Sequence, residues 1–150
     1  MLMQKTRALI AIGLLAGMAT ACDRPAAEDL TRPDTSAGPK VYFANLRDGQ
    51  TVSSPFKVVF GLKEWGVAPA GVDKPKTGHH HLLINTTLSE EEMQYAIPMT
   101  DNHRHFGGGQ TEVVLDLPPG QHTLQLILGD MNHELFTPPI MSDIITVTVK

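Results

Sequence analysis

The chain has 150 residues, and its composition already excludes several classes of protein. Only 5% of the residues are aromatic, while 13 glycines and 11 prolines separate short apolar runs, which favours a small β-rich domain over a helical bundle. The formal net charge is −4, with all 16 acidic residues but only 10 of the 12 basic ones after Cys22. No basic patch is present, so nucleic acid is not expected as a partner.

The first 21 residues have the layout of a bacterial export signal. Two basic residues precede an uncharged apolar run over 8–18, which is shorter than the roughly 20 residues that span a bilayer. Small residues and then Cys22 follow, as in the lipobox of bacterial lipoproteins, whose cysteine is acylated. Ala19 stands where a lipobox usually has leucine, so ordinary cleavage after Ala21 is the alternative. We expect lipidation of Cys22, because an unpaired exported cysteine otherwise needs a separate explanation.

A tether is expected between this membrane anchor and a folded domain. Residues 22–39 are rich in proline and charge, and they cannot bury enough apolar surface to offset the entropy of ordering. By resemblance to lipoproteins of enteric-type bacteria, Asp23 favours the inner membrane. Cys22 is the only cysteine, so no disulfide forms within one chain and residues 40–150 must fold on their core alone.

The first half of the domain reads as strands and loops. A short strand is expected at 41–43, and a second at 56–62 with alternate residues from Phe56 on one buried face. Residues 63–77 contain two prolines and two glycines and are expected to form a long loop, followed by a strand over 79–85. Ser89 and Glu92 have the spacing of a capping box, which predicts one or two helical turns.

The second half continues the β pattern. Residues 101–110 are polar, end in three glycines and are expected to form a loop. Strands are expected over 111–117 and 121–128, and the Pro118-Pro119-Gly120 turn between them predicts a hairpin. After a loop over 132–142, a last strand closes the chain at 143–150.

About seven short strands separated by turns are typical of an all-β, immunoglobulin-like antiparallel sandwich. A small β-barrel is the alternative architecture. The N-terminal segments and this sandwich give three parts, namely a signal peptide at 1–21, a tether at 22–39 and a β-sandwich domain at 40–150.

Histidines are the residues that point to chemistry. Within the expected strand, His79 and His81 point to one face and His80 to the other, and two imidazoles at this spacing can share a metal. His103 and His105 repeat the spacing just before three glycines, whose backbone freedom lets the loop fold against the first cluster. His133 lies beyond the end of a strand, where binding groups are commonly mounted.

The candidate metal ligands are therefore His79, His81, His105 and His133. The candidate supporting residues are Glu112, Asp130, His80 and His103, of which the two carboxylates are suited to orienting a ligand. An all-nitrogen site without thiolate suits copper(II) or zinc. No zinc-signature spacing is present, so the alternative is that the histidines only bridge backbone groups. His122 shares the parity of the apolar residues after it, and we expect it to be structural.

Several segments carry a resemblance to a known family. They include GVAPAG at 66–71, TGHHHLLI at 77–84, HFGGGQTE at 105–112 and PPGQHTLQL at 118–126, and together with further segments they cover essentially all of 40–150. The domain resembles the DUF4399 family of exported bacterial proteins, a domain of unknown function. The resemblance implies a periplasmic or surface β domain and no particular activity. Relatives often have a second histidine soon after the position of His133, where this chain has Leu135-Phe136.

The sequence thus predicts a periplasmic lipoprotein that captures copper or zinc through neutral imidazoles. Its metal affinity is expected to decrease as the pH drops below about 6.5. Two alternatives stay open. One is a structural or interaction domain of the cell envelope, which meets a partner protein at a sheet edge. The other is a metal-dependent hydrolase. The enzyme is less favoured, because nothing in the sequence names a substrate. The chain also has no G-x-S-x-G, P-loop or dinucleotide-binding motif.

Overall fold

The computed structural model describes residues 38–150. The predictions for the export signal, for Cys22 and Asp23, and for the tether up to residue 37 lie outside the described residues. Within them, no helix is both long and apolar enough to cross a membrane.

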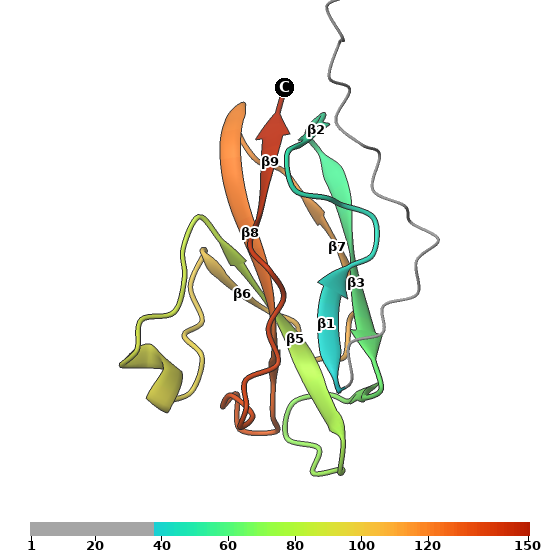
Figure 1. Ribbon diagram of the computed structural model, residues 1–150, viewed down its shortest axis with the longest axis vertical. Coiled ribbons are helices and arrows are strands. Elements are labelled where there is room, and N and C mark those ends of the chain that lie inside the picture. Colours follow the sequence, from blue (N-terminus) through green and yellow to red (C-terminus); the bar gives the residue numbers. More distant parts are fainter. Residues whose placement is uncertain (1–37) are drawn as a thin grey trace, which may run out of the picture. The chain divides into compact units, whose positions relative to one another are not determined.

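Two β-sheets build the domain (Figure 1). The smaller is antiparallel, with the order β1 (Lys40–Phe43), β3 (Phe56–Lys63), β7 (Glu112–Leu115). The larger has the order β2 (Gln50–Val52), β9 (Ile145–Val149), β8 (Gly120–Gly129), β5 (Thr77–Ile84), β4 (Gly66–Val67), and β6 (His103–His105) also pairs with β5. The pairs β2–β9 and β4–β5 are parallel. The predicted immunoglobulin-like sandwich is confirmed, and the barrel is not formed.

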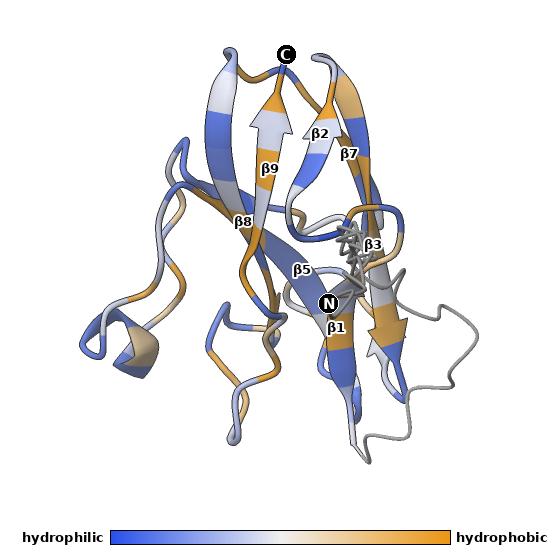
Figure 2. Cartoon of the chain, turned by 45° about the horizontal axis from the view of Figure 1, so that its top comes forward, coloured by the Kyte–Doolittle hydropathy of each residue, from blue (hydrophilic) through white to orange (hydrophobic). Residues whose placement is uncertain are grey.

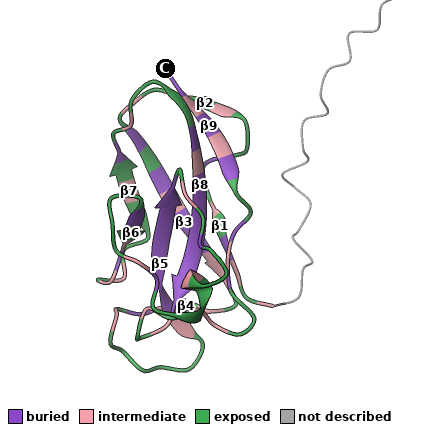
Figure 3. Cartoon of the chain, turned by 90° about the vertical axis from the view of Figure 1, so that its left-hand side faces the viewer, coloured by how far each residue is buried: buried purple, intermediate pink, exposed green. Residues whose placement is uncertain are grey.

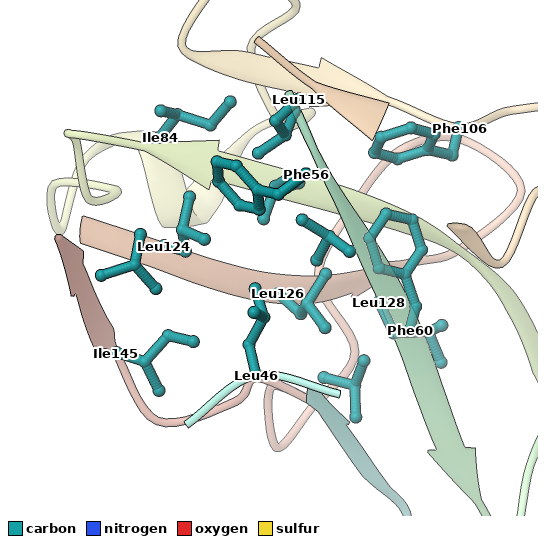
Figure 4. Close-up of a cluster of buried hydrophobic side chains, with 14 of the residues drawn as sticks. Leu46, Phe56, Phe60, Ile84, Phe106, Leu115, Leu124, Leu126, Leu128 and Ile145 are labelled. Atoms are coloured by element: carbon teal, nitrogen blue, oxygen red, sulfur yellow. The ribbon is translucent and has the colours of Figure 1, made fainter. Parts of the chain in front are cut away.

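The main core lies between the two sheets (Figure 4). It takes alternate residues from each strand, because successive side chains of a strand point to opposite faces. The predicted inward face of β3 is confirmed for Phe56, Val58 and Phe60, which are buried, whereas Leu62 is half-buried. Leu124, Leu126 and Leu128 fill the same core from β8.

A second, smaller core covers the other face of the larger sheet. It consists of Leu83, Leu88, Ile97 and Ile127, with Leu135 and Met141 packed against it. Segments 85–102 and 130–142, which come after β5 and β8, supply four of these six residues. Strand β5 is therefore buried on both faces, and Figure 3 shows it buried along almost its whole length. This burial places both faces of the histidine run inside the protein.

The predicted hairpin is wrong. Strand β7 pairs with β3 in the smaller sheet, while β8 pairs with β5 and β9 in the larger one. The Pro118-Pro119 pair lacks two backbone N–H groups, so it cannot continue a ladder between the flanking strands, and the chain crosses from one sheet to the other at this point.

Two short strands occupy stretches that were predicted to be loops. Strand β4 lies within 63–77 and β6 within 101–110, and each pairs with β5. The capping box is present, since Ser89 N–H donates to Glu92 Oε2 at 2.8 Å and Glu92 N–H donates to Ser89 Oγ at 3.2 Å. It begins a single turn of 3-10 helix, η1 (Glu92–Gln94).

Candidate metal centre

The histidine run divides by strand parity, as the sequence predicts. All three residues are fully buried, although Figure 2 colours this part of β5 as hydrophilic. The His80 ring faces the main core, where its centroid lies 5.2 Å from that of Phe60. His79 and His81 lie on the opposite face, with ring centroids 4.8 Å apart. The larger sheet therefore carries a pair of imidazoles on its outer face.

Two more imidazoles meet this pair. Strand β6 places His105 directly opposite His81 in the ladder, and a loop after β8 brings in His133. The six centroid distances among the four rings run from 4.7 to 5.9 Å. The structure thus brings together the four histidines that were predicted to share a site, and we call them the histidine cluster.

Ring nitrogens point toward one another within the histidine cluster. The Nε2 atoms of His79 and His81 are 3.0 Å apart, and those of His105 and His133 are 3.1 Å apart. His79, His81 and His105 each offer one ligand nitrogen, and these three atoms all lie within 4.8 Å of one another. A single metal ion is the simplest species that such a set of nitrogen atoms can surround.

A tight loop presents His133. Its backbone adopts a φ of +70°, in the left-handed region that a non-glycine residue seldom occupies. Asp130 holds this turn, because its Oδ1 accepts the N–H groups of Asn132 and Glu134, both at 2.8 Å. The His133 carbonyl accepts the N–H of Ile97 at 2.7 Å. Asp130 is thus placed to support the cluster through the backbone of this loop.

Glycines make room for the rings. A Cβ atom at Gly107 would lie 2.3 Å from Cε1 of His105, and one at Gly129 would lie 2.9 Å from Nε2 of His81. No other residue type fits at either place without moving an imidazole. The sequence pointed to the three-glycine run as a whole, through its backbone freedom, whereas the role of Gly129 was missed. The available signal was an isolated glycine at the end of an apolar strand, which often marks a close approach.

Burial favours the neutral form of three rings of the cluster, those of His79, His81 and His105. It lowers the pKa of His79 to about 4, and repulsion from His105 and His133 adds to this shift while the charge of Asp130 opposes it. Burial likewise lowers the pKa of His81 to about 3, with His79 as the next cause. The pKa of His105 is lowered by burial and by His133. Near neutral pH these rings are therefore uncharged and have lone pairs available for a metal.

Several buried ring nitrogens lack a protein partner among the described residues. They are Nδ1 of His79, both ring nitrogens of His80, Nδ1 of His81 and Nε2 of His103. If His79 and His81 share a hydrogen bond through Nε2, one of them must donate, and the other then carries its proton on Nδ1 with no acceptor. An unpartnered buried donor costs about 1–3 kcal/mol, so the pair is not an arrangement that stability alone explains.

The remaining candidates lie outside the cluster. Glu112 pairs with Lys57 at 2.8 Å between β7 and β3, and none of its described contacts reaches a histidine. Nδ1 of His103 is 2.8 Å from Thr100 Oγ1. Burial lowers the pKa of His80 to about 4.

The structural role predicted for His122 is confirmed. Its Nδ1 lies 2.9 Å from the Asn85 amide nitrogen, and its Nε2 lies 2.8 Å from the Pro118 carbonyl oxygen. Both ring nitrogens therefore have a partner within the protein, and neither is left to bind a metal.

Comparison with known protein families shows which family the chain belongs to. The family model DUF4399, a domain of unknown function, matches residues 58–150. The chain belongs to the DUF4399 family. This match covers β3 to β9 apart from the first two residues of β3, and with them all four histidines of the cluster. Neither the curated proteins nor the solved structures include a match to the chain.

Proposed function

We propose that this DUF4399 protein is an exported, lipid-anchored module that binds one divalent transition metal ion, copper(II) or zinc. The ligands are His79, His81 and His105, with His133 as a fourth. The observation that supports this proposal is the convergence of four imidazoles, with two pairs of Nε2 atoms 3.0 and 3.1 Å apart. The anchor is Cys22, and the segment up to residue 39 tethers the domain to the membrane.

The spacing of the nitrogens fits such an ion. Metal–nitrogen bonds of about 2.0–2.1 Å place neighbouring ligand nitrogens about 2.9 Å apart in a square-planar site and about 3.3 Å apart in a tetrahedral one. The observed separations of 3.0 and 3.1 Å lie between these values. The ligand atoms of His79, His81 and His105 lie within 4.8 Å of one another, so the two pairs would have to move toward each other to surround copper(II) or zinc.

The chemistry of the donors narrows the choice of ion. Imidazole nitrogens without thiolate or carboxylate suit copper(II), nickel(II) and zinc, and they suit calcium and magnesium poorly. Copper(II) binds most tightly among the divalent first-row ions at a given nitrogen site. The rings of His79 and His81 are neutral before the metal arrives, so binding at these two ligands displaces few protons near pH 7.

Calorimetric titration of the tag-free full chain with zinc and with copper(II) tests the proposal. One ion per chain is expected. His81→Ala should abolish binding, because it removes a fully buried ligand whose ring centroid lies 4.8 Å from that of His79 and 5.1 Å from that of His105. His122→Ala is the matched control, since this histidine hydrogen-bonds elsewhere and its loss should leave the stoichiometry unchanged. The absence of binding at micromolar metal would overturn the proposal.

The membrane anchor needs a separate test. Cys22→Ala removes the acylation site and should move the protein from the membrane fraction to the soluble fraction of the exported material. If the Cys22→Ala protein still fractionates with membranes, the lipid anchor is ruled out. This result would leave metal binding untouched, because the ligands lie within the described domain.

A further inference from the structure

The histidine cluster has a buried half and a peripheral half. His79 and His81 come from β5, which is paired with other strands on both sides, and both side chains are fully buried. His105 lies on β6, a strand of three residues, and is half-buried. His133 is also half-buried and is the only member of the cluster that no strand holds. The four ligands are therefore not equivalent in rigidity or in access to solvent.

His133 differs from the other three histidines in how its backbone is held. Its ring centroid lies 4.7 Å from that of His105 and 4.9 Å from that of His79, and its Nε2 is 3.1 Å from that of His105. The ligand atoms of His79, His81 and His105, all on strands, lie within 4.8 Å of one another. The left-handed backbone of His133 is a conformation that costs of order 1–3 kcal/mol and persists only where the surroundings enforce it. The Asp130 side chain supplies part of that support, because its Oδ1 accepts two N–H groups of the loop. Backbone hydrogen bonds supply the rest, from His133 N–H to the Asp130 carbonyl at 3.1 Å and from Ile97 N–H to the His133 carbonyl at 2.7 Å.

The buried half lacks the partners that usually fix a histidine ligand. A ligating imidazole commonly donates its other N–H to a carboxylate or carbonyl, and loss of such a partner typically costs 10–100-fold in metal affinity. Metal bound at Nε2 of His79 and His81 places their protons on Nδ1, where neither has an acceptor among the described residues. This arrangement favours a labile site over a permanent structural one.

We infer that metal enters and leaves the cluster through His133, so that the site transfers its ion to an acceptor and does not store it. This inference rests on the proposed metal binding. In the exchange step, the bond from the metal to the His133 imidazole breaks as a bond from a ligand of the acceptor forms. His79, His81 and His105 keep the ion meanwhile, and its oxidation state does not change. Asp130 is the positioning residue that sets His133 in place.

The test is the release of zinc from the full chain to the chromogenic chelator 4-(2-pyridylazo)resorcinol, followed by stopped-flow absorbance. His133→Asn removes the imidazole and retains a residue that tolerates a left-handed backbone. It should still bind one zinc ion per chain and release it about tenfold faster or more than the wild type. His79→Asn should not retain stoichiometric zinc.

Two variants of Asp130 separate positioning from charge. Asp130→Ala removes the acceptor of the loop and should also speed release, whereas Asp130→Asn keeps an oxygen acceptor and should stay close to the wild-type rate. Failure of the wild type to bind zinc would overturn the proposed function itself. Zinc binding with an unchanged release rate in His133→Asn, or a loss of stoichiometric binding as complete as in His79→Asn, would overturn the inference alone.

Discussion

The Nε2 atoms of His79 and His81 lie 3.0 Å apart on the outer face of β5, and a glycine in the neighbouring strand makes this contact possible. Gly129 is the ladder partner of His79, and its missing side chain leaves the space that the His81 ring occupies. The site thus depends on an exact fit between two central strands as well as on its ligands.

Adding one methyl group at this glycine should therefore weaken metal binding. Gly129→Ala places a Cβ 2.9 Å from Nε2 of His81, and Gly107→Ala places one 2.3 Å from Cε1 of His105, so each should displace a ligand ring. A loss of zinc affinity of about tenfold or more is expected, comparable to the loss of a supporting contact. Calorimetry measures it.

Gly66→Ala is the matched control for these two variants. Its Cβ would meet nothing closer than Thr77 Cγ2 at 3.4 Å, and no positive φ strains the position. Zinc affinity should stay at the wild-type value. Equal losses in all three variants would mean that the glycines act on the fold in general and not on the rings.

Because these histidines are buried, we expect the free energy of unfolding to decrease in acid. An unfolded histidine has a pKa near 6.5, while burial holds that of His80 at about 4 and that of His81 at about 3. The unfolded chain therefore binds more protons below pH 6.5, so the stability contributed by the neutral rings is complete above that pH and is lost as the pH falls toward 4. For His80 alone the loss is about 3 kcal/mol.

Urea unfolding at pH 7.5, 6.0 and 5.0, without metal, measures this dependence. The midpoint should fall with each step. His80→Leu removes one titrating ring and should make the dependence on pH shallower. A midpoint that stays constant down to pH 5.0 would contradict the burial of neutral rings.

The same pKa values change the expected response of metal binding to pH. The sequence predicts a loss of affinity below about pH 6.5, the value for an exposed imidazole. Because the pKa values of His79 and His81 lie at about 4 and about 3, protons do not compete for these two rings until lower pH. We expect zinc affinity at pH 6.0 to stay within about tenfold of its value at pH 7.5.

Glu112 should be dispensable for the metal. It pairs with Lys57 between β7 and β3, and both side chains are more than half exposed. Glu112→Gln should leave zinc affinity unchanged and should lower stability by less than about 1 kcal/mol, as for other exposed ion pairs. A clear loss of affinity, measured by calorimetry beside the wild type, would instead return Glu112 to the supporting role that the sequence suggests.

Much of the site could be predicted from local pattern, because strand parity alone separates His80 from His79 and His81. The sequence could predict only approximately where His105 lies. His103-Arg104-His105 has no apolar alternation, so nothing in it predicts that β6 pairs with β5. The turn of His133 depends on the side chain of Asp130 accepting N–H groups ahead of it, which spacing does not reveal.

The pairing of strands that are distant in the chain could not be predicted from the sequence, for a general reason. The alternation in 111–117 and 121–128 shows that each has a buried face, and it is the same for a hairpin as for strands in two facing sheets. Only the Pro118-Pro119 pair indicates the crossing, because neither residue can donate to a ladder.

X-ray absorption spectroscopy of the zinc-loaded full chain tests the central claim most directly, because it reports the atoms bound to the metal. The account predicts a first shell of nitrogen at about 2.0–2.1 Å, with the multiple scattering of three or four imidazoles. It also predicts that His122→Ala leaves this signature unchanged. A shell of oxygen ligands with one imidazole or none would show that the ion binds elsewhere, and it would contradict the assignment of the histidine cluster as the metal site.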